Sequence, residues 1–142
     1  MKAAQWHKVI DVSLHGFFRV TQPLLLPMLR TRWGRILNVS SVAALAGNRG
    51  QANYAAAKGG LNSATKALSL EVASRGVTVN AIAPGIIESP MATSEGAAFD
   101  AEAIKRIVPS QRAGTPEEVA ALAAFLAGPE AGYITEIGRA HV

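Results

Sequence analysis

Two side chains that could act together on a carbonyl lie near the middle of the chain. Tyr54 and Lys58 are four residues apart in the run YAAAK, so on a helix their phenol and ammonium share one face and one electrostatic field. The run RILNV, residues 35–39, is followed by two hydroxyls, Ser40 and Ser41, and Ser41 lies thirteen residues before the tyrosine. A hydroxyl, a phenol and an ammonium can together polarise a carbonyl and transfer a proton to its oxygen. The sequence therefore indicates acid catalysis on a carbonyl as the hypothesis to test.

The same pair also has a simpler interpretation, because a tyrosine and a lysine at this spacing occur by chance on many helix surfaces. Its setting favours a functional pair. Ser41 follows a short apolar run, Ile36 to Val39, which is typical of a central strand in a parallel sheet covered on both faces. Open α/β sheets bind their ligands at the carboxyl ends of such strands.

Composition excludes several kinds of site. With 142 residues, 49% of them hydrophobic, the chain suits one domain or part of a larger one. The absence of cysteine excludes disulfides and thiolate metal sites, and the three histidines are too dispersed to predict a metal site. The apolar runs are too short for a membrane span and the first residues lack the apolar centre of a secretory signal, so we expect a cytoplasmic protein. The net charge of +4 comes without a lysine- or arginine-rich tract, which favours a solvated surface over nucleic-acid binding.

Helical spacing of apolar residues predicts one long helix, or two abutting helices, from Ala3 to Arg30. Pro23 and Pro27 each remove a backbone donor inside it, which predicts a kink or a restart near Val20 to Gln22. Gly34 is expected to end this helix.

The next helix is rich in alanine and is predicted from Ala52 to Arg75, after a loop over residues 42–51. Gly76 is expected to end it. Gly59 and Gly60 disfavour a helix interior, so their presence predicts that another segment packs very close to them.

A second buried strand is predicted from Val77 to Ala83 and ends at Pro84-Gly85. Residues 86–113 show a weaker pattern with one short helix over 100–108, and a loop of this length is typical of a lid. Thr115 is expected to cap the last helix, Glu117 to Ala127, with Glu118 closing a capping box.

Strand, helix and strand with short connections predict a parallel crossover in an α/β fold. These elements alone cannot cover a doubly wound sheet, whose edge and faces need further strands. The sequence also lacks a glycine-rich phosphate loop after a first strand. We therefore predict the C-terminal part of a Rossmann-like doubly wound parallel sheet, lacking the N-terminal phosphate-binding half, in one partial domain over residues 1–135.

These motifs make the chain similar to the C-terminal portion of the classical short-chain dehydrogenases/reductases. The resemblance runs from Trp6 to Thr135 and is most specific in GQANYAAAKG, residues 50–59. Within the family, the chain most resembles the bacterial 3-oxoacyl-(acyl-carrier-protein) reductases. The resemblance implies an NAD(P)-dependent oxidoreductase, using NADP(H) rather than NAD(H), that reduces a carbonyl to an alcohol. The implied substrate is a 3-oxoacyl thioester, as in fatty-acid synthesis.

The resemblance also implies a catalytic role for four residues. Tyr54 is the general acid that protonates the carbonyl oxygen as hydride arrives from the nicotinamide. Lys58 favours the phenolate form of Tyr54 and also hydrogen-bonds the nicotinamide ribose. Ser41 holds the substrate carbonyl, whereas Ser40 is structural. Ser13 stands where the family often has an asparagine that supports a proton-relay water, which implies an altered relay or one that uses more water.

The cofactor is implied to meet the segment after the second strand. There Pro84 and Gly85 precede Ile87, whose backbone meets the nicotinamide carboxamide, and Ser89, whose hydroxyl replaces the threonine that anchors the cofactor. The lid, about residues 88–112, closes over the substrate and sets specificity.

Two kinds of partner follow from the resemblance. An acyl carrier protein, which is acidic, is implied to dock on Arg32 and Arg75 near the mouth of the site, although both arginines also suit solvated helix ends. Self-association as a dimer or tetramer is implied for the full-length parent.

The two ends differ from what the resemblance predicts. Relatives carry a glycine-rich turn, and a strand that selects NAD or NADP, before Trp6, and a final strand after Thr135. Residues 136–142 instead read EIGRAHV, which a common sequencing adapter encodes when read in frame. We therefore expect a truncated gene with a non-native tail, and a chain that is inactive alone.

Two other functions stay open. One is a dehydrogenase of the same family for another alcohol, such as a sugar or polyol, and the lid would decide this. The other is a non-catalytic remnant that acts only as a dimerisation module through the helices over residues 3–30 and 52–75. Intact Ser41, Tyr54 and Lys58 argue against the remnant, whereas the missing phosphate loop argues against activity in this chain alone.

Overall fold

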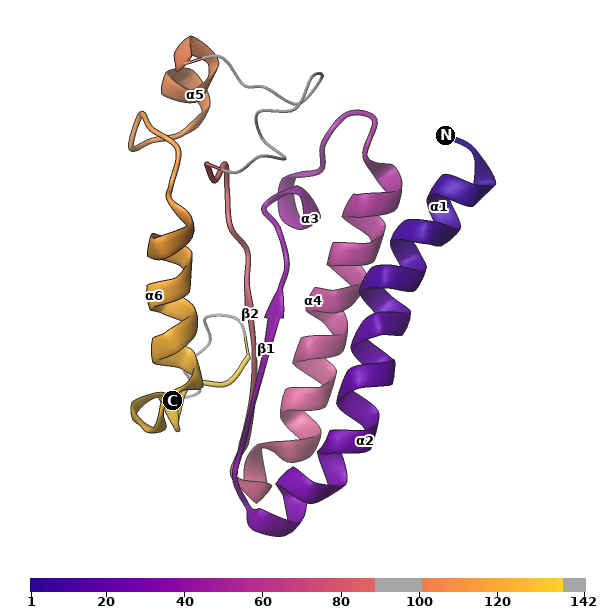
Figure 1. The fold of residues 1–142 in the computed structure, drawn as a ribbon, viewed down its shortest axis with the longest axis vertical. Helices are drawn as coiled ribbons and strands as arrows, with labels where there is room; N and C mark the ends of the chain where they lie inside the picture. The colour runs from indigo at the N-terminus through magenta and orange to yellow at the C-terminus, as the bar shows by residue number, and fades with distance from the viewer. Residues whose placement is uncertain (89–100, 137–142) are drawn as a thin grey trace.

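The computed structural model describes residues 1–88 and 101–136. Residues 89–100, which include Ser89 and much of the predicted lid, and residues 137–142 lie outside the described range. The described part is an α/β arrangement with one small parallel sheet (Figure 1). Its helical elements are α1 (Ala3–Ile10), the π-helix η1 (Asp11–His15), α2 (Gly16–Thr31), α3 (Ala43–Ala46), α4 (Ala52–Val72), η2 (Ala73–Arg75), α5 (Ala101–Ile107), α6 (Pro116–Ala127) and η3 (Pro129–Ala131). Among the described residues, none of the helices combines the length and apolarity that a membrane crossing requires.

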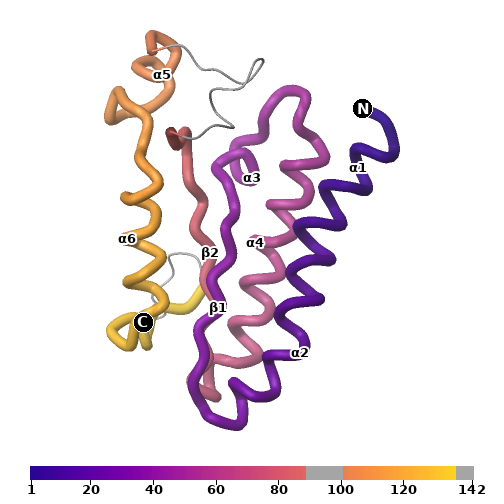
Figure 2. Tube along the Cα trace, in the orientation of Figure 1, coloured from indigo at the N-terminus to yellow at the C-terminus, as the bar shows by residue number. Residues whose placement is uncertain are grey.

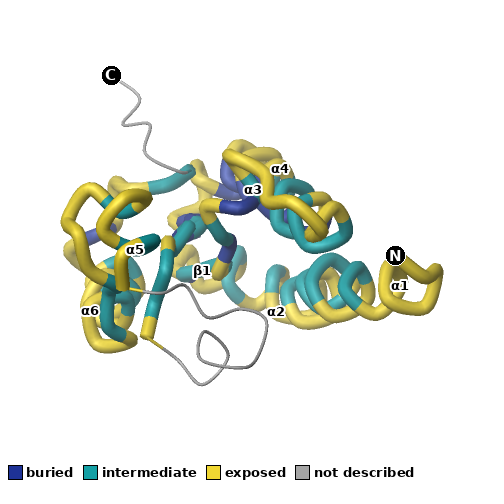
Figure 3. The backbone as a smooth tube through the Cα atoms, turned by 90° about the horizontal axis from the view of Figure 1, so that it is seen from above, coloured by how far each residue is buried: buried dark blue, intermediate teal, exposed yellow. Residues whose placement is uncertain are grey.

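The sheet consists of β1 (Gly34–Val39) and β2 (Val77–Ile82), which run parallel with Gly34 opposite Val77 and Val39 opposite Ile82. The helix α4 links them, which confirms the predicted crossover. On one face of the sheet lie α4 and α2, and on the other lies α6 (Figures 1 and 3). The helical run α1–η1–α2 lies alongside α4 (Figure 2).

The core lies between the sheet and the α2–α4 layer. Val72, Val77 and Val79 are almost fully buried there. Because side chains alternate along a strand, Val77 and Val79 share the face toward α4, while Thr78 and Asn80 take the other. Partly buried apolar side chains complete this cluster: Leu25, Met28, Leu29, Ile36 and Leu68.

The prediction that the helix restarts near Val20 to Gln22 is wrong. The chain instead departs from α-helical geometry at η1, and α2 runs without interruption through Pro23 and Pro27. Both prolines are exposed, so water can bond the carbonyls that their rings leave without a helical partner. The wide turn of η1 is spanned by a 2.6 Å contact between His15 Nδ1 and Asp11 Oδ1.

The end of α2 also differs from the prediction that Gly34 stops it. Arg32 takes the left-handed conformation there, with φ of 53°. Gly34 begins β1 and is buried, and a Cβ on it would come within 2.8 Å of Met28 Sδ. Its small size therefore serves close packing. The predicted loop over residues 42–51 contains the short helix α3.

The glycines of α4 behave differently from each other. A Cβ on Gly60 would meet the Cδ atoms of Leu14 at 3.1 Å, which confirms close packing of η1 against α4. A Cβ on Gly59 would meet Ala44 O at 3.9 Å, an ordinary van der Waals contact. Gly76 ends η2 at φ of 74°, as expected for the stop of this helical segment.

The capping box of α6 is confirmed. Thr115 Oγ1 accepts the Glu118 N–H at 3.3 Å, and Glu118 Oε2 accepts the Thr115 N–H at 2.9 Å. Arg112 donates to the same carboxylate, with Nη1 at 2.8 Å from Oε2. The hydrogen bond from Arg112, followed by that from the Thr115 backbone, lowers the pKa of Glu118 to about 2.

This carboxylate predicts an acid-sensitive contribution to stability. Because the folded state lowers the pKa of Glu118 from 4.5 to about 2, the contribution is fully present above 4.5 and is lost as the pH falls toward 2. Glu118→Gln is therefore expected to destabilise the chain at neutral pH, and the difference from the parent should shrink on acidification. Urea unfolding of both proteins between about pH 6 and pH 2.5 measures this. Glu117→Gln, in the same turn, is the control, and an equal pH dependence in both variants would contradict the assignment.

Candidate functional site

Hydrogen bonds join the carboxyl ends of β1 and β2 and the residues that follow them. The Ser40 N–H donates to Ile82 O at 2.7 Å, and two residues later the Val42 N–H donates to Pro84 O at 3.1 Å. These bonds bring the segment that carries Ser41 beside the segment that carries Pro84, at the same edge of the sheet. Predicted site residues from two distant parts of the chain are thus neighbours.

Ser41 begins the turn into α3. It is half-buried, and its Oγ accepts the Ala43 N–H at 3.2 Å. Since a hydroxyl has one donor and two acceptor positions, this contact leaves its O–H available to a ligand. Ser40 is 3% exposed and its Oγ donates to Lys58 O at 3.4 Å, which ties the end of β1 to α4.

Tyr54 and Lys58 lie together on the first turns of α4. The Lys58 Nζ is 5.7 Å from the centroid of the Tyr54 ring, and both side chains are half-buried. The Nζ also donates to Val39 O at 2.7 Å, so the ammonium sits between the phenol ring and the end of β1. Burial lowers the pKa of Lys58 below its ordinary value. The spacing in the sequence correctly predicted that the phenol and the ammonium share a face.

A neighbouring asparagine, which the sequence analysis missed, holds the start of α4. Asn53 Oδ1 accepts the Tyr54 N–H at 2.9 Å, and its Nδ2 donates to Gln5 O at 3.2 Å. The turn that carries Tyr54 is therefore linked to α1. Because Asn53 lies inside α4 and its contact with Gln5 joins distant parts of the chain, no local pattern could have identified it.

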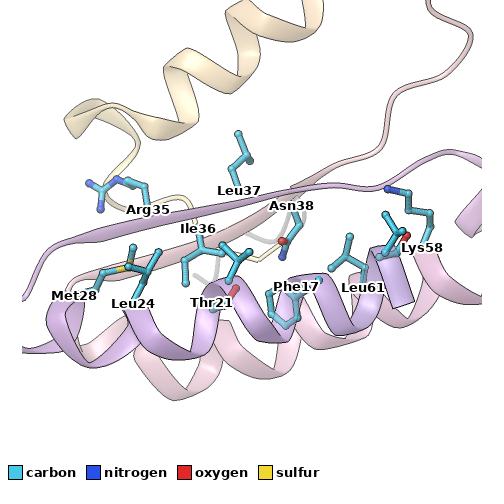
Figure 4. Close-up of a pocket in the computed structure, with 14 residues that line it drawn as sticks. Phe17, Thr21, Leu24, Met28, Arg35, Ile36, Leu37, Asn38, Lys58 and Leu61 are labelled. Carbon is cyan, nitrogen blue, oxygen red and sulfur yellow. The ribbon is translucent and has the colours of Figure 1, made fainter. Parts of the chain in front are cut away.

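A groove of about 440 Å³ opens between η1–α2 and β1, with Lys58 at one end (Figure 4). Ser13 lies in η1 and lines the same groove, so the structure brings these two predicted residues to one cavity. Its walls are mainly apolar and consist of Val12, Ser13, Gly16, Phe17, Val20, Thr21, Leu24, Met28, Arg35, Ile36, Leu37, Asn38, Lys58 and Leu61.

The segment after β2 is held by a strand-like contact with Gly114. Gly114 N donates to Ile86 O at 3.0 Å, and the Glu88 N–H donates to Gly114 O at 2.9 Å. Because backbone groups alternate in direction along an extended segment, the N–H and C=O of Ile87 point away from Gly114. Ser89, the other predicted cofactor contact here, lies outside the described residues.

The two arginines predicted to dock a carrier lie at the other end of the sheet. Arg32 caps α2 and Arg75 ends η2, just before the two strands begin, and Arg32 Nη2 donates to Ser74 O at 3.1 Å. The six residues of β1 separate this end from Ser41 by about 20 Å. The prediction that they flank the site is therefore wrong within one chain, because strand direction places residues before and after a strand at opposite edges.

The arrangement suits proton transfer to a polarised oxygen. The Tyr54 phenol and the Lys58 ammonium lie together, and Lys58 bonds Val39 O, two residues before Ser41. The segment with Pro84 is bonded to Val42, the residue after Ser41. The Lys58 ammonium favours negative charge on neighbouring oxygens. The chemistry that such a set supports is stabilisation and protonation of a developing alkoxide.

Comparison with known proteins gives one consistent family. The family model described as enoyl-(acyl carrier protein) reductase matches residues 1–138. The 3-oxoacyl-(acyl-carrier-protein) reductase of Vibrio cholerae is 47% identical over 135 residues, which cover 95% of this chain and 55% of that protein. Nodulation protein G of a Rhizobium species is 46% identical with the same coverage, and a Synechocystis 3-oxoacyl-(acyl-carrier-protein) reductase is 48% identical over 95% of this chain and 53% of its own length. The chain thus spans about half the length of the curated relatives it matches.

Proposed function

Because the chain belongs to the short-chain dehydrogenase/reductase family, we propose that it supplies the proton-transfer half of an oxidoreductase that reduces the carbonyl of a 3-oxoacyl thioester. The observation that supports this proposal is that Tyr54 and Lys58 share one face of α4 and that Lys58 Nζ donates to Val39 O, two residues before Ser41. The names of the Vibrio cholerae and Synechocystis relatives support the substrate class.

In the proposed reaction, each side chain has one task. The Ser41 O–H donates to the substrate carbonyl oxygen and orients it, and the Tyr54 phenol gives that oxygen its proton. Lys58, held 5.7 Å from the phenol ring, stabilises the phenolate that the transfer leaves behind. Ser13, on the wall of the same groove, is proposed to support the water that returns a proton.

The proposed cofactor is NADPH, which supplies the hydride when it is bound. The residues present fit its nicotinamide end: the Lys58 ammonium can donate to a ribose hydroxyl, and the N–H and C=O of Ile87 face away from Gly114. Pro84 and Gly85 precede this segment, and Ser89 is proposed to add a hydroxyl. The 142 residues contain no glycine-rich phosphate loop, so this chain alone is expected to bind NADPH weakly.

A hybrid protein tests the proposed function. In it, the matching region of the Vibrio cholerae reductase is replaced by residues 1–135 of this chain. We expect the hybrid to oxidise NADPH when an acetoacetyl thioester is added, because the relative then supplies the rest of the fold. This chain alone is the control, and fluorescence titration should show no micromolar NADPH binding. A folded hybrid that binds NADPH but leaves the thioester unreduced would contradict the proposal.

We propose an acyl carrier protein as partner, docked on Arg32 and Arg75. Arg32 Nη2 bonds the backbone of Ser74, the residue before Arg75, and the positive charge of the two arginines suits an acidic surface. Arg32→Glu with Arg75→Glu in the hybrid is expected to raise KM about tenfold or more for a carrier-linked substrate. The KM for the same acyl group on coenzyme A should stay unchanged, and Arg49→Glu, in the loop after α3, is the matched control. Equal effects on both substrates would remove the two arginines from docking.

Self-association could bring Arg32 and Arg75 of one copy close to the candidate site of another copy, which lies at the other end of the sheet. We propose that two copies meet through the outer face of α2 and α4, where Phe18 is exposed and Leu68 lines a groove of about 290 Å³. In a two-fold dimer with crossed helices, the amino end of one sheet approaches the carboxyl end of the other. A strictly monomeric hybrid in light scattering would contradict this arrangement.

A further inference from the structure

Asn53 caps the helix that carries Tyr54 from inside that helix. The first helical bond of α4 runs from the Ala55 N–H to Gln51 O at 2.8 Å, so the Tyr54 N–H precedes the regular helical bonds. Asn53 Oδ1 accepts this N–H at 2.9 Å. The side chain of Gln51, the N-cap residue, is engaged in the preceding loop, where its Oε1 accepts Asn48 Nδ2 at 3.1 Å. The backbone at Tyr54 therefore depends on the neighbouring asparagine.

The same amide reaches a second helix. Asn53 Nδ2 donates to Gln5 O at 3.2 Å, and α1 lies along α4 (Figure 2). An asparagine amide offers one carbonyl acceptor and an NH₂ donor, and here each of the two makes one of these bonds. An aspartate of the same size would keep the acceptor and lose the donor. The residue type thus matches the two contacts.

The helical run that receives this bond is attached to α4 at a second place. A Cβ added to Gly60 would lie 3.1 Å from the Cδ atoms of Leu14, so η1 packs closely on α4 there. Gly60 follows Asn53 by about two helical turns. With two attachments to α4, α1 and η1 form a support for its first turn, and the bond from Asn53 is the attachment adjacent to Tyr54.

A separate set of bonds holds Lys58 to β1. Its Nζ donates to Val39 O at 2.7 Å, and Ser40 Oγ donates to Lys58 O at 3.4 Å. The 5.7 Å approach of the ammonium to the Tyr54 ring therefore depends on two supports, β1 for the lysine and α1 for the turn that carries the tyrosine. A displacement of about 1 Å in a reacting group can reduce a rate about 10²-fold.

We propose that Asn53 is a positioning residue for Tyr54: its amide joins the Tyr54 backbone to α1 and thereby sets where the phenol lies relative to Lys58. This role rests on the proton donation proposed for Tyr54. Asn53 acts through the backbone and needs no contact with substrate or cofactor. Because the amide makes two bonds, two substitutions can remove them in turn.

Asn53→Asp removes one of the two bonds. The carboxylate can still accept the Tyr54 N–H, and an acidic side chain in the first turn favours the helix, but it has no donor for Gln5 O. Asn53→Ala removes both bonds. Asn48→Asp is the matched control, because it makes the same change and adds the same charge in the loop before α4, where Asn48 contacts Gln51.

The position of the phenol can be followed in this chain without catalysis. The chain contains two tyrosines, so tyrosine labelled with ¹³C at Cζ gives two NMR signals, from Tyr54 and Tyr133. Both Asn53 variants should move the Tyr54 signal by more than its line width. The Tyr133 signal should stay in place, since this residue is 81% exposed and follows η3. An unmoved Tyr54 signal in both variants, or an equal shift with Asn48→Asp, would overturn the proposal.

The kinetic test uses the hybrid protein. With Asn53→Asp, kcat for an acetoacetyl thioester should fall about tenfold or more, whereas the dissociation constant of NADPH should change less than about twofold. A merely structural role would weaken NADPH binding together with kcat, and that result would contradict positioning. So would a variant that keeps the kcat of the parent. An inactive parent hybrid would instead be a failure of the proposed function, and the tyrosine signals would still decide whether Asn53 sets the position of the phenol.

Discussion

Tyr54→Phe in the hybrid protein is expected to reduce kcat for an acetoacetyl thioester by a factor of about 10²–10⁴, the range that general acid catalysis supplies. The substitution removes one hydroxyl and keeps the ring, so the packing of α4 and the 5.7 Å approach of Lys58 should persist. NADPH affinity is expected to change little, because the ribose contact is assigned to Lys58. The loss should therefore fall on kcat, measured by nicotinamide absorbance, with the dissociation constant of NADPH nearly constant.

The chain contains a matched control for this substitution. Tyr133 is the other tyrosine, it is 81% exposed, and it lies after η3, far along the chain from the site. Tyr133→Phe makes the same chemical change and should leave kcat unaffected. If Tyr54→Phe keeps more than about a tenth of the activity, the phenol is not the proton donor. If both variants lose activity equally, the effect is structural and says nothing about proton transfer.

Local patterns predicted the parts of the site that depend on neighbouring residues. The four-residue spacing of Tyr54 and Lys58 determines their shared face, because helical periodicity alone sets it. The capping box of Thr115 and Glu118 and the stop at Gly76 follow from backbone groups within a few residues. The strands were predicted within one or two residues from short apolar runs.

Contacts between distant segments could not be predicted in this way. The π-helical turn at η1 lies where Leu14 packs on Gly60, and nothing in the local sequence marks it. The prolines did not make the helix restart, because both are exposed and water can bond the carbonyls that they leave without a helical partner. Arg32 and Arg75 were placed by resemblance near the site, whereas strand direction moves them to the opposite edge. Such errors arise wherever tertiary packing, rather than local propensity, decides the geometry.

Gly76→Ala is expected to be the most destabilising single-methyl change in the described fold. Gly76 has φ of 74°, a conformation that costs an ordinary residue about 1–2 kcal/mol. A Cβ at this position would also overlap Arg32 O, a backbone atom that cannot rotate away. The turn before β2 would then have to move away from the turn before β1. The parallel pair of strands begins at this point.

Gly47→Ala separates the two causes of this effect. Gly47 also has φ of 74°, but a Cβ there would meet nothing within 4 Å. The free energy of unfolding of its alanine variant should fall only by the cost of placing alanine at a positive φ, about 1–2 kcal/mol. Gly76→Ala should lose about 2–5 kcal/mol, because overpacking against backbone adds to that cost. Urea unfolding of the two variants and the parent chain measures the difference. Equal losses would mean that the Arg32 turn moves freely, and that the start of the sheet is less rigidly packed than the contact between Gly76 and Arg32 implies.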